Sequence, residues 1–290
     1  ELQPDYAEAY NNLGNVYKEL EEYNQAISVY EKAIELNPEY YEAYNNLGVV
    51  LGKNEQYEEA EKVLKQVIQS QPDFVEALNN LGSILTCMEK YEESKAILNR
   101  SIEIHPSNAE GLSNLGDIYR KLHEYEYAVD HYKRAIQIKP NYYEALNGMG
   151  LALTELKKYS EAKDILKQAI KINPKFAEAY NNLGNIYKAI KQFYMAIMYH
   201  KKALRIDKNL AGIHNNLGHT YTLIGDRRNL IHHRIASSLE PHNMELYSPL
   251  LFNSNYSPDM NAEEIFEYYK LYDQRFGLPY KEKWKAFAKP

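Results

Sequence analysis

Asparagine recurs in this sequence at intervals of 34 residues, and its side-chain amide can both donate and accept hydrogen bonds. A regular row of amides can bind the main chain of an extended peptide without selecting for particular side chains. We therefore expect a peptide-binding surface made of the recurring asparagines and of two that follow them three residues later: Asn12, Asn46, Asn80, Asn114, Asn182, Asn216, Asn15 and Asn185. Gly148 takes the fifth place in the row and would leave a gap.

A structural interpretation of the same row stays open. Asparagine is a poor helix former because its side chain competes for backbone hydrogen bonds, so these amides could simply bond to neighbouring backbone. A row of glutamates accompanies them, with Gly212 in the seventh place: Glu8, Glu42, Glu76, Glu110, Glu144 and Glu178. Acidic residues in a first helical turn stabilise the helix dipole by about 0.3–1 kcal/mol each, and selection of basic ligands is the alternative role.

Residues for other kinds of chemistry are sparse or unsuitably spaced. The single cysteine, Cys87, excludes an internal disulfide. A zinc site on a helix favours histidines four residues apart, whereas His214 and His219 are five apart and His232 and His233 are adjacent. No glycine-rich phosphate loop, nucleophile elbow or isolated carboxylate pair stands outside the repeating pattern. We therefore expect no metal site, no catalytic residue and no enzymatic activity in this chain.

Composition narrows the range of partners. The 40 acidic residues outnumber the 34 basic ones, so the formal net charge is -6 and no basic field favours nucleic acid. Mean hydropathy is -0.62, and no apolar run approaches the roughly 18 residues of a membrane-spanning helix, so we expect no membrane partner. The single cysteine and the lack of a signal-peptide pattern predict a cytoplasmic location, or also a nuclear one if the source is eukaryotic.

Proline and glycine show that most of the chain is repetitive. Six prolines from Pro4 to Pro174, and seven glycines from Gly14 to Gly218, are spaced by 34 residues. We interpret residues 1–6 as the end of a preceding repeat and residues 244–290 as a helical cap and linker. Between them lie seven repeats, at 7–40, 41–74, 75–108, 109–142, 143–176, 177–210 and 211–243.

The sequence pattern of each repeat predicts two antiparallel helices. In the first repeat, one helix carries a stripe at Tyr10, Leu13, Gly14 and Tyr17, and the next carries a stripe at Ala26, Tyr30 and Ala33 before Pro38 ends it. Glycine costs about 1 kcal/mol of helix propensity, so its recurrence inside a helix implies close packing. Neither helix can bury its stripe alone, and successive pairs must therefore stack into an all-α solenoid.

This pattern, Tyr10-x2-Leu13-Gly14-x2-Tyr17 followed by Ala26-x3-Tyr30 and Pro38, resembles the tetratricopeptide repeat (TPR). The resemblance implies a right-handed α-solenoid whose first helices line a concave groove, which would place the asparagine row in that groove. It also implies extended polypeptides or protein substrates as partners, and it allows a homodimer through the convex face.

The residues after the repeats carry a second pattern. Met244–Phe252 predicts a further helix, and Asn261 with Glu264 predicts a capping box in front of another amphipathic helix. The run Leu250-Leu251-Phe252-x2-Asn255-Tyr256-x-Pro258-Asp259 resembles the segment that joins the repeats to the catalytic domain in O-GlcNAc transferases and SPINDLY-like O-glycosyltransferases.

This second resemblance implies that the chain is the substrate-recognition arm of a protein O-glycosyltransferase. It also implies that a nucleotide sugar, UDP-GlcNAc or GDP-fucose, binds to a catalytic part beyond Pro290, with no cofactor in the chain itself. The alternative is a stand-alone TPR scaffold or assembly protein with no enzymatic partner domain.

Overall fold

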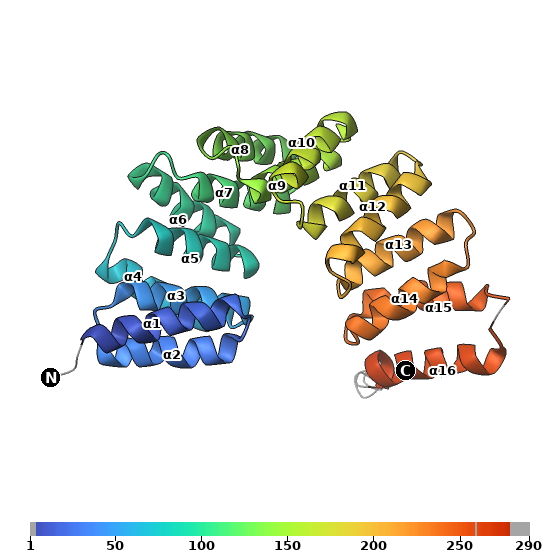
Figure 1. The fold of residues 1–290 in the computed structure, drawn as a ribbon, viewed down its shortest axis with the longest axis horizontal. Helices are drawn as coiled ribbons and strands as arrows, with labels where there is room; N and C mark the ends of the chain where they lie inside the picture. Colours follow the sequence, from blue (N-terminus) through green and yellow to red (C-terminus); the bar gives the residue numbers. More distant parts are fainter. Residues whose placement is uncertain (1–3, 259, 279–290) are drawn as a thin grey trace, which may run out of the picture. The chain divides into compact units, whose positions relative to one another are not determined.

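The computed structural model describes residues 4–258 and 260–278, and every regular element in these ranges is helical (Figure 1). The chain forms two compact units that divide between Leu156 and Lys157. The first unit contains α1 (Pro4–Glu19), α2 (Tyr23–Leu36), α3 (Tyr41–Lys53), α4 (Tyr57–Ser70), α5 (Val75–Cys87), α6 (Tyr91–Ile104), α7 (Ala109–Lys121), α8 (Tyr125–Ile138) and α9 (Tyr143–Glu155). The second contains α10 (Tyr159–Ile172), α11 (Ala177–Ala189), α12 (Phe193–Ile206), α13 (Ala211–Leu223), α14 (Arg228–Leu239), α15 (Tyr247–Asn255) and α16 (Ala262–Tyr272).

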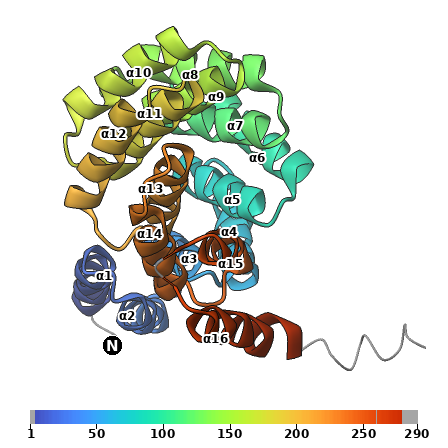
Figure 2. The same cartoon turned by 90° about the vertical axis from the view of Figure 1, so that its right-hand side faces the viewer.

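First and second helices of the pairs alternate along the chain, and the first helices from α3 to α13 begin 34 residues apart. Within each unit, a second helix contacts the first helix of its own pair and the first helix of the next pair (Figure 2). First helices also contact one another directly, as in α3 with α5 and α5 with α7. The all-α solenoid of helix pairs predicted from the sequence is confirmed.

A glycine lets the two helices of each pair approach closely. On α5, a Cβ added to Gly82 would lie 2.5 Å from Cγ of Leu98, a fully buried side chain of α6. The same relation recurs in the pairs Gly14–Tyr30, Gly48–Leu64 and Gly116–Tyr132. The packing reason predicted for the recurring glycine is therefore confirmed, and its partner is the large side chain sixteen residues later.

A residue in the left-handed region turns the chain between the two helices of each pair. Its φ lies between 59° and 62° at Glu21, Glu55, Glu89, His123, Lys157 and Lys191, and is 70° at Gly225. Side chains in this region cost of order 1 kcal/mol each, so packing of the helix pair must hold the turn in place. Because six of these seven positions are not glycine, the residue types at the turn do not predict its left-handed conformation.

The two ends of the repeat array differ in detail from the expected boundaries. α1 begins at Pro4 rather than at Ala7, so residues 4–6 are part of the first helix. A 3-10 turn at Met244–Leu246 precedes α15, which therefore starts and ends three residues later than the helix expected at 244–252. Residues 279–290, the last part of the cap and linker expected at 244–290, lie outside the described residues.

The last two helices pack through aromatic side chains. Asn261 and Glu264 form the predicted capping box at the start of α16. The ring of Tyr247 on α15 lies 6.3 Å from that of Tyr272 and 5.3 Å from that of Phe276, which covers part of the apolar stripe predicted there. In the described parts of the chain, no helix combines the length and the hydropathy needed to cross a membrane.

Replacing Gly82 by alanine should lower the free energy of unfolding by about 1–3 kcal/mol, because the added methyl group overpacks against Leu98. The control is Gly212→Ala on α13, where an added Cβ meets nothing within 4 Å. There the gain in helix propensity should stabilise the protein by up to about 1 kcal/mol. Thermal unfolding followed by circular dichroism measures both effects, and stabilisation by both substitutions would contradict the close contact.

Candidate functional site

The predicted asparagine row links neighbouring first helices. In four cases the Nδ2 atom donates to the residue 35 positions earlier: Asn46 to Oδ1 of Asn11 (3.0 Å), Asn80 to Oδ1 of Asn45 (2.9 Å), Asn216 to Oδ1 of Asn181 (3.2 Å) and Asn114 to the backbone oxygen of Asn79 (3.4 Å). One hydrogen-bond donor of each of these amides therefore serves the fold. The second amide hydrogen of each remains for other partners, and so does the carbonyl oxygen of Asn46, Asn80 and Asn114. Oδ1 of Asn216, by contrast, accepts a hydrogen bond from Lys188 at 3.3 Å.

Three of the four residues that accept these bonds are more deeply buried than the amides that donate to them. Asn11, Asn45 and Asn79 expose only 1–8% of their surface. Asn79 and Asn108 exchange hydrogen bonds at 3.1 and 2.8 Å, and the hydroxyl of Ser101 donates to Oδ1 of Asn79 at 2.8 Å. The sequence signal for this role is the Asn-Asn doublet, which occurs in five of the seven repeats and places an acceptor directly before a donor.

The other predicted residues lie in different environments. Asn12 on α1 is exposed and bonds to no described residue, whereas Asn182 is buried. Oδ1 of Asn15 accepts a hydrogen bond from the hydroxyl of Tyr30 at 2.8 Å. Oδ1 of Asn185 is buried and accepts no hydrogen bond from a described residue. The structure thus assembles most of the row as links inside the fold, and peptide binding by the row stays a prediction.

The face formed by α3, α5 and α7 is hollowed by two adjoining cavities of about 200 and 210 Å³. The cavity between α3 and α5 is lined by Val49, Gly52, Lys53, Asn80 and Ile84, among others, and the cavity between α5 and α7 by Thr86, Asn114, Asp117, Arg120 and Lys121. Ser83 and Cys87 belong to both linings. Two members of the asparagine row therefore border a hollow surface, although its floor comes from residues that the sequence did not single out.

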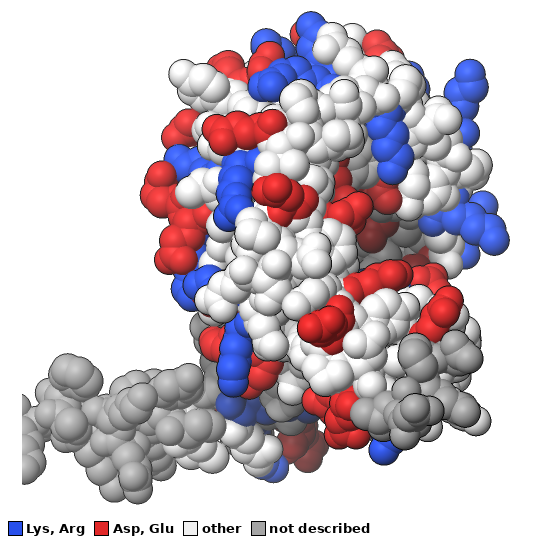
Figure 3. Space-filling view, turned by 90° about the vertical axis from the view of Figure 1, so that its left-hand side faces the viewer, with Lys and Arg blue, Asp and Glu red and all other residues white. Residues whose placement is uncertain are grey.

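Positive charge predominates around these two cavities. Lys53 and Lys121 are exposed and form no ion pair with a described residue. Nη2 of Arg120 lies 3.5 Å from Oδ1 of Asp117, which also accepts a hydrogen bond from the Tyr132 hydroxyl at 2.7 Å. Burial, followed by the charge of Asp117, raises the pKa of Tyr132, so this phenol stays protonated. On the face seen in Figure 3, acidic and basic side chains are interspersed.

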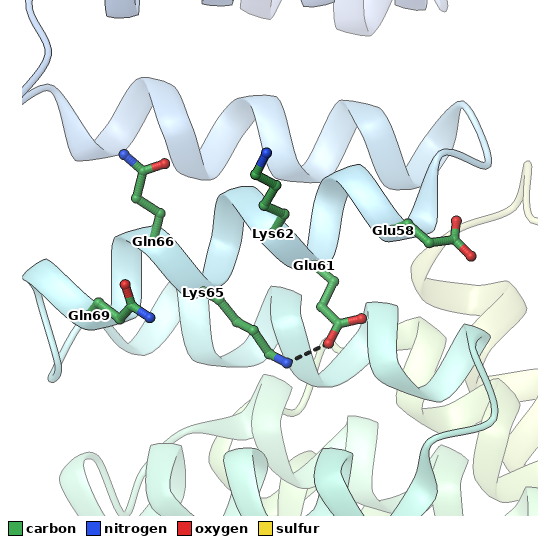
Figure 4. A pocket seen from close by; sticks show the side chains of 6 residues that line it. All are labelled: Glu58, Glu61, Lys62, Lys65, Gln66 and Gln69. Carbon is green, nitrogen blue, oxygen red and sulfur yellow. Dashed lines mark hydrogen bonds and ion pairs between the residues drawn. The ribbon is translucent and has the colours of Figure 1, made fainter.

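A larger cavity, about 560 Å³, lies elsewhere, along α4. Its lining consists of Glu58, Glu61, Lys62, Lys65, Gln66 and Gln69, which all project from this one helix (Figure 4). Glu61 is paired with Lys65 at 2.5 Å and with Lys90, the residue before α6, at 2.7 Å, and these two hydrogen bonds lower its pKa. A surface of long, charged side chains from a single helix is an ordinary solvated face, and we assign no ligand to it.

Family models match the repeated helix pairs. A TPR repeat model matches residues 14–55 and 150–191, and tetratricopeptide repeat models match residues 73–141, 177–210 and 41–74. Together they cover residues 14–141 and 150–210, which is more than half of the chain. The chain belongs to the tetratricopeptide repeat family.

Solved structures share the fold of this TPR chain. A tetratricopeptide repeat protein from Parabacteroides merdae is similar over 92% of this chain and 99% of its own, with a TM-score of 0.63 and 17% identity. PilF of Pseudomonas aeruginosa is similar over 70% of this chain and 93% of its own, with a TM-score of 0.57 and 20% identity. Such low identities show a common fold only. No curated protein matches the chain.

Histidines gather in the last TPR helix pairs, and two of them form a direct pair. Nε2 of His214 lies 3.0 Å from the backbone oxygen of Lys208, and this nitrogen must donate because a carbonyl only accepts. In its neutral form His214 therefore accepts at Nδ1, which lies 3.0 Å from Nδ1 of His232. Protonation of both rings would set two N–H groups against each other, so this contact requires at least one of the two rings to be neutral.

Two other histidines take the place that tyrosine or leucine occupies in earlier repeats. His200 packs against Gly184 and His233 packs against Gly218, and both side chains are fully buried. Burial, reinforced by Lys188, lowers the pKa of His200 to about 3. Burial, reinforced by the neighbouring histidines, lowers the pKa of His233 to about 4. Folding of these TPR pairs therefore requires neutral imidazoles.

Replacing Asn80 by alanine should lower the free energy of unfolding by about 1 kcal/mol relative to the matched variant Asn12→Ala. Only Asn80 loses a bond to a neighbouring first helix, while the gain in helix propensity is the same for both substitutions. Urea unfolding without any ligand measures the difference. Equal stability of the two variants would show that the amide has no structural role.

Acid should destabilise the second unit before the first. His200 and His233 bind protons more weakly in the folded chain than in the unfolded chain, where their pKa is about 6.5. Their contribution to stability is therefore complete above pH 6.5 and is lost as the pH falls toward 4. By pH 5 the loss is about 2 kcal/mol per buried histidine. Hydrogen exchange should show faster opening of α12–α14 than of α2–α6 at that pH.

The variant His200→Tyr serves as the control. It restores the tyrosine that stands next to an asparagine in the first repeat, where the Tyr30 hydroxyl bonds to Asn15. The corresponding asparagine beside His200 is Asn185, whose buried oxygen lacks a partner among the described residues. The variant should reduce the acid sensitivity of α12, and unchanged sensitivity would remove His200 from this explanation.

Proposed function

We propose that this chain is a TPR interaction module that binds an extended polypeptide along the face of its first helices. The observation that carries the proposal is the pair of adjoining cavities across α3, α5 and α7. A hollow surface that continues from one repeat to the next suits a linear ligand better than a compact one. The outer cavity on α4, by contrast, offers no apolar floor.

The asparagine row has a supporting part in this proposal. Asn80 and Asn114 border the two cavities and keep one N–H and one carbonyl oxygen that are not used by their links to the neighbouring helices. These groups can bond to the main chain of a bound segment. Because the ligand loses its conformational freedom on binding, the affinity for a single short peptide should be modest.

We infer a finer role from the residues after the repeats, as the substrate-recognition arm of an O-GlcNAc transferase-like protein O-glycosyltransferase. What favours it is the run from Leu250 to Asp259 together with the capping box that opens α16. Described residues 4–258 and 260–278 contain no strand and so offer no Rossmann-type site for UDP-GlcNAc or GDP-fucose. The coding sequence downstream of Pro290 tests this role: alternating strand and helix patterns would support it, and a short remainder would favour a stand-alone scaffold.

Blocking the cavities should abolish polypeptide binding. Cys87 is the only cysteine in the sequence, is exposed and lines both cavities, so a bulky maleimide can be attached there without any mutation. Passing a pool of short random peptides over the immobilised protein, and identifying the retained ones by mass spectrometry, should yield a bound set. Protein blocked at Cys87 should lose that set, because the label occupies the ligand's space.

The matched control carries the same label on a second helix. In the double variant Cys87→Ser, Glu103→Cys, the maleimide is attached at an exposed position of α6. The peptide set should then be retained as in the unlabelled protein. Equal retention by the protein blocked at Cys87 would place peptide binding outside the cavities. Retention by neither protein would contradict the proposed function.

A further inference from the structure

The two cavities occur where the first-helix face carries small side chains. In α3 and α5 the positions at the cavity floor hold Gly52, Ser83, Thr86 and Cys87. The equivalent positions of α1 hold the larger Asn15, Lys18 and Glu19. The hollow across α3, α5 and α7 therefore depends on small side chains that α1 does not carry.

The cavity between α3 and α5 suits an apolar side chain. Its floor includes Val49 and Ile84, and Ile84 is 7% exposed. A volume of about 200 Å³ has room for a side chain of the size of leucine, isoleucine or methionine. Burial of such a side chain contributes about 1.5–3 kcal/mol when it is complete.

The cavity between α5 and α7 suits a carboxylate. Its charged residues are Arg120 and Lys121 against Asp117, and Lys53 adds a further positive charge on the neighbouring lining. The contact between Nη2 of Arg120 and Oδ1 of Asp117 is long, at 3.5 Å, so Asp117 does not use all the donors of this guanidinium. A guanidinium with donors to spare is well suited to a ligand carboxylate.

The spacing between the two cavities sets the spacing of the ligand residues. The cavities lie on consecutive pairs of first helices, and packed helices are typically 8–10 Å apart. An extended peptide advances about 3.3 Å per residue, so a step from one cavity to the next corresponds to about three residues. The shared wall of Ser83 and Cys87 would lie beneath the intervening residues.

We propose that these two cavities select extended segments in which a medium-sized apolar side chain and a carboxylate lie about three residues apart. This selectivity rests on the proposed function, since it concerns the same groove. Val49 and Ile84 contact the apolar side chain, and Arg120 and Lys121 bind the carboxylate. The excess of positive charge at this site, within a chain of net charge -6, favours acidic over basic segments.

Three synthetic peptides test the selectivity through the native cysteine. The first is Gly-Ser-Leu-Ser-Ser-Glu-Ser-Gly with both ends blocked, the second has lysine in place of glutamate, and the third has alanine in place of leucine. The rate at which a small aromatic disulfide modifies Cys87 reports occupancy of the shared wall, and it is measured at mildly alkaline pH because desolvation raises the pKa of this thiol. The leucine–glutamate peptide should slow the reaction and bind about tenfold more tightly than the other two.

A charge-reversal variant completes the test. Lys121→Glu should remove most of the preference for glutamate over lysine, because it reverses the charge nearest the carboxylate. Lys133→Glu makes the same change at an exposed position of α8 that lines neither cavity, and it should leave the preference for glutamate unaltered. Folding of each variant is checked by circular dichroism.

Two outcomes would overturn this selectivity. One is equal protection of Cys87 by all three peptides, and the other is protection by none of them. The proposed function is judged separately by the random peptide pool: if blocking Cys87 abolishes retention while the three designed peptides show no preference, the groove binds polypeptide and the selectivity alone is wrong.

Discussion

The contact between a first-helix glycine and a large side chain of the second helix sets the geometry of the helix pairs in six of the seven repeats. Because Gly82 has no Cβ, α5 and α6 approach until Leu98 fills the space beside the main chain of α5. The pair then hides its apolar stripes and leaves the other side of each first helix for the neighbouring repeats and for solvent. Since this contact recurs every 34 residues, successive first helices present equivalent positions on one face.

The identity of this large side chain also determines which kinds of residue stand on the first-helix face. Where it is tyrosine, its hydroxyl reaches the residue directly after the glycine, as in Tyr30 with Asn15 and Tyr132 with Asp117. Where it is leucine, no hydroxyl arrives, and the residue after the glycine is Val49 or Ser83. These smaller or apolar residues line the cavities. The chemistry of the hollow surface is thus coupled to packing on the opposite side of the same helix.

Much of the fold could be predicted because its signals are local. The helix pairs, the recurring glycine contact and the Asn261–Glu264 capping box all follow from spacing within one or two helices. The partners of the amides could not be predicted, since the bond from Asn46 to Asn11 joins two repeats and an amide in a regular row can serve a ligand equally well. The cavities could not be predicted either, because their walls combine small side chains from neighbouring helices.

The structural and binding interpretations of the asparagine row support each other. An amide that donates to the neighbouring helix, as Asn80 does, has already lost its rotamer freedom when the chain folds. Its remaining N–H and carbonyl oxygen are held in fixed directions, so binding a peptide would not have to order that side chain again. Asn12 lacks such a link to a described residue, and the same contact made there would cost additional entropy. The hydrogen bonds that use one N–H group of these amides therefore also fix the remaining N–H and carbonyl groups in place for a ligand.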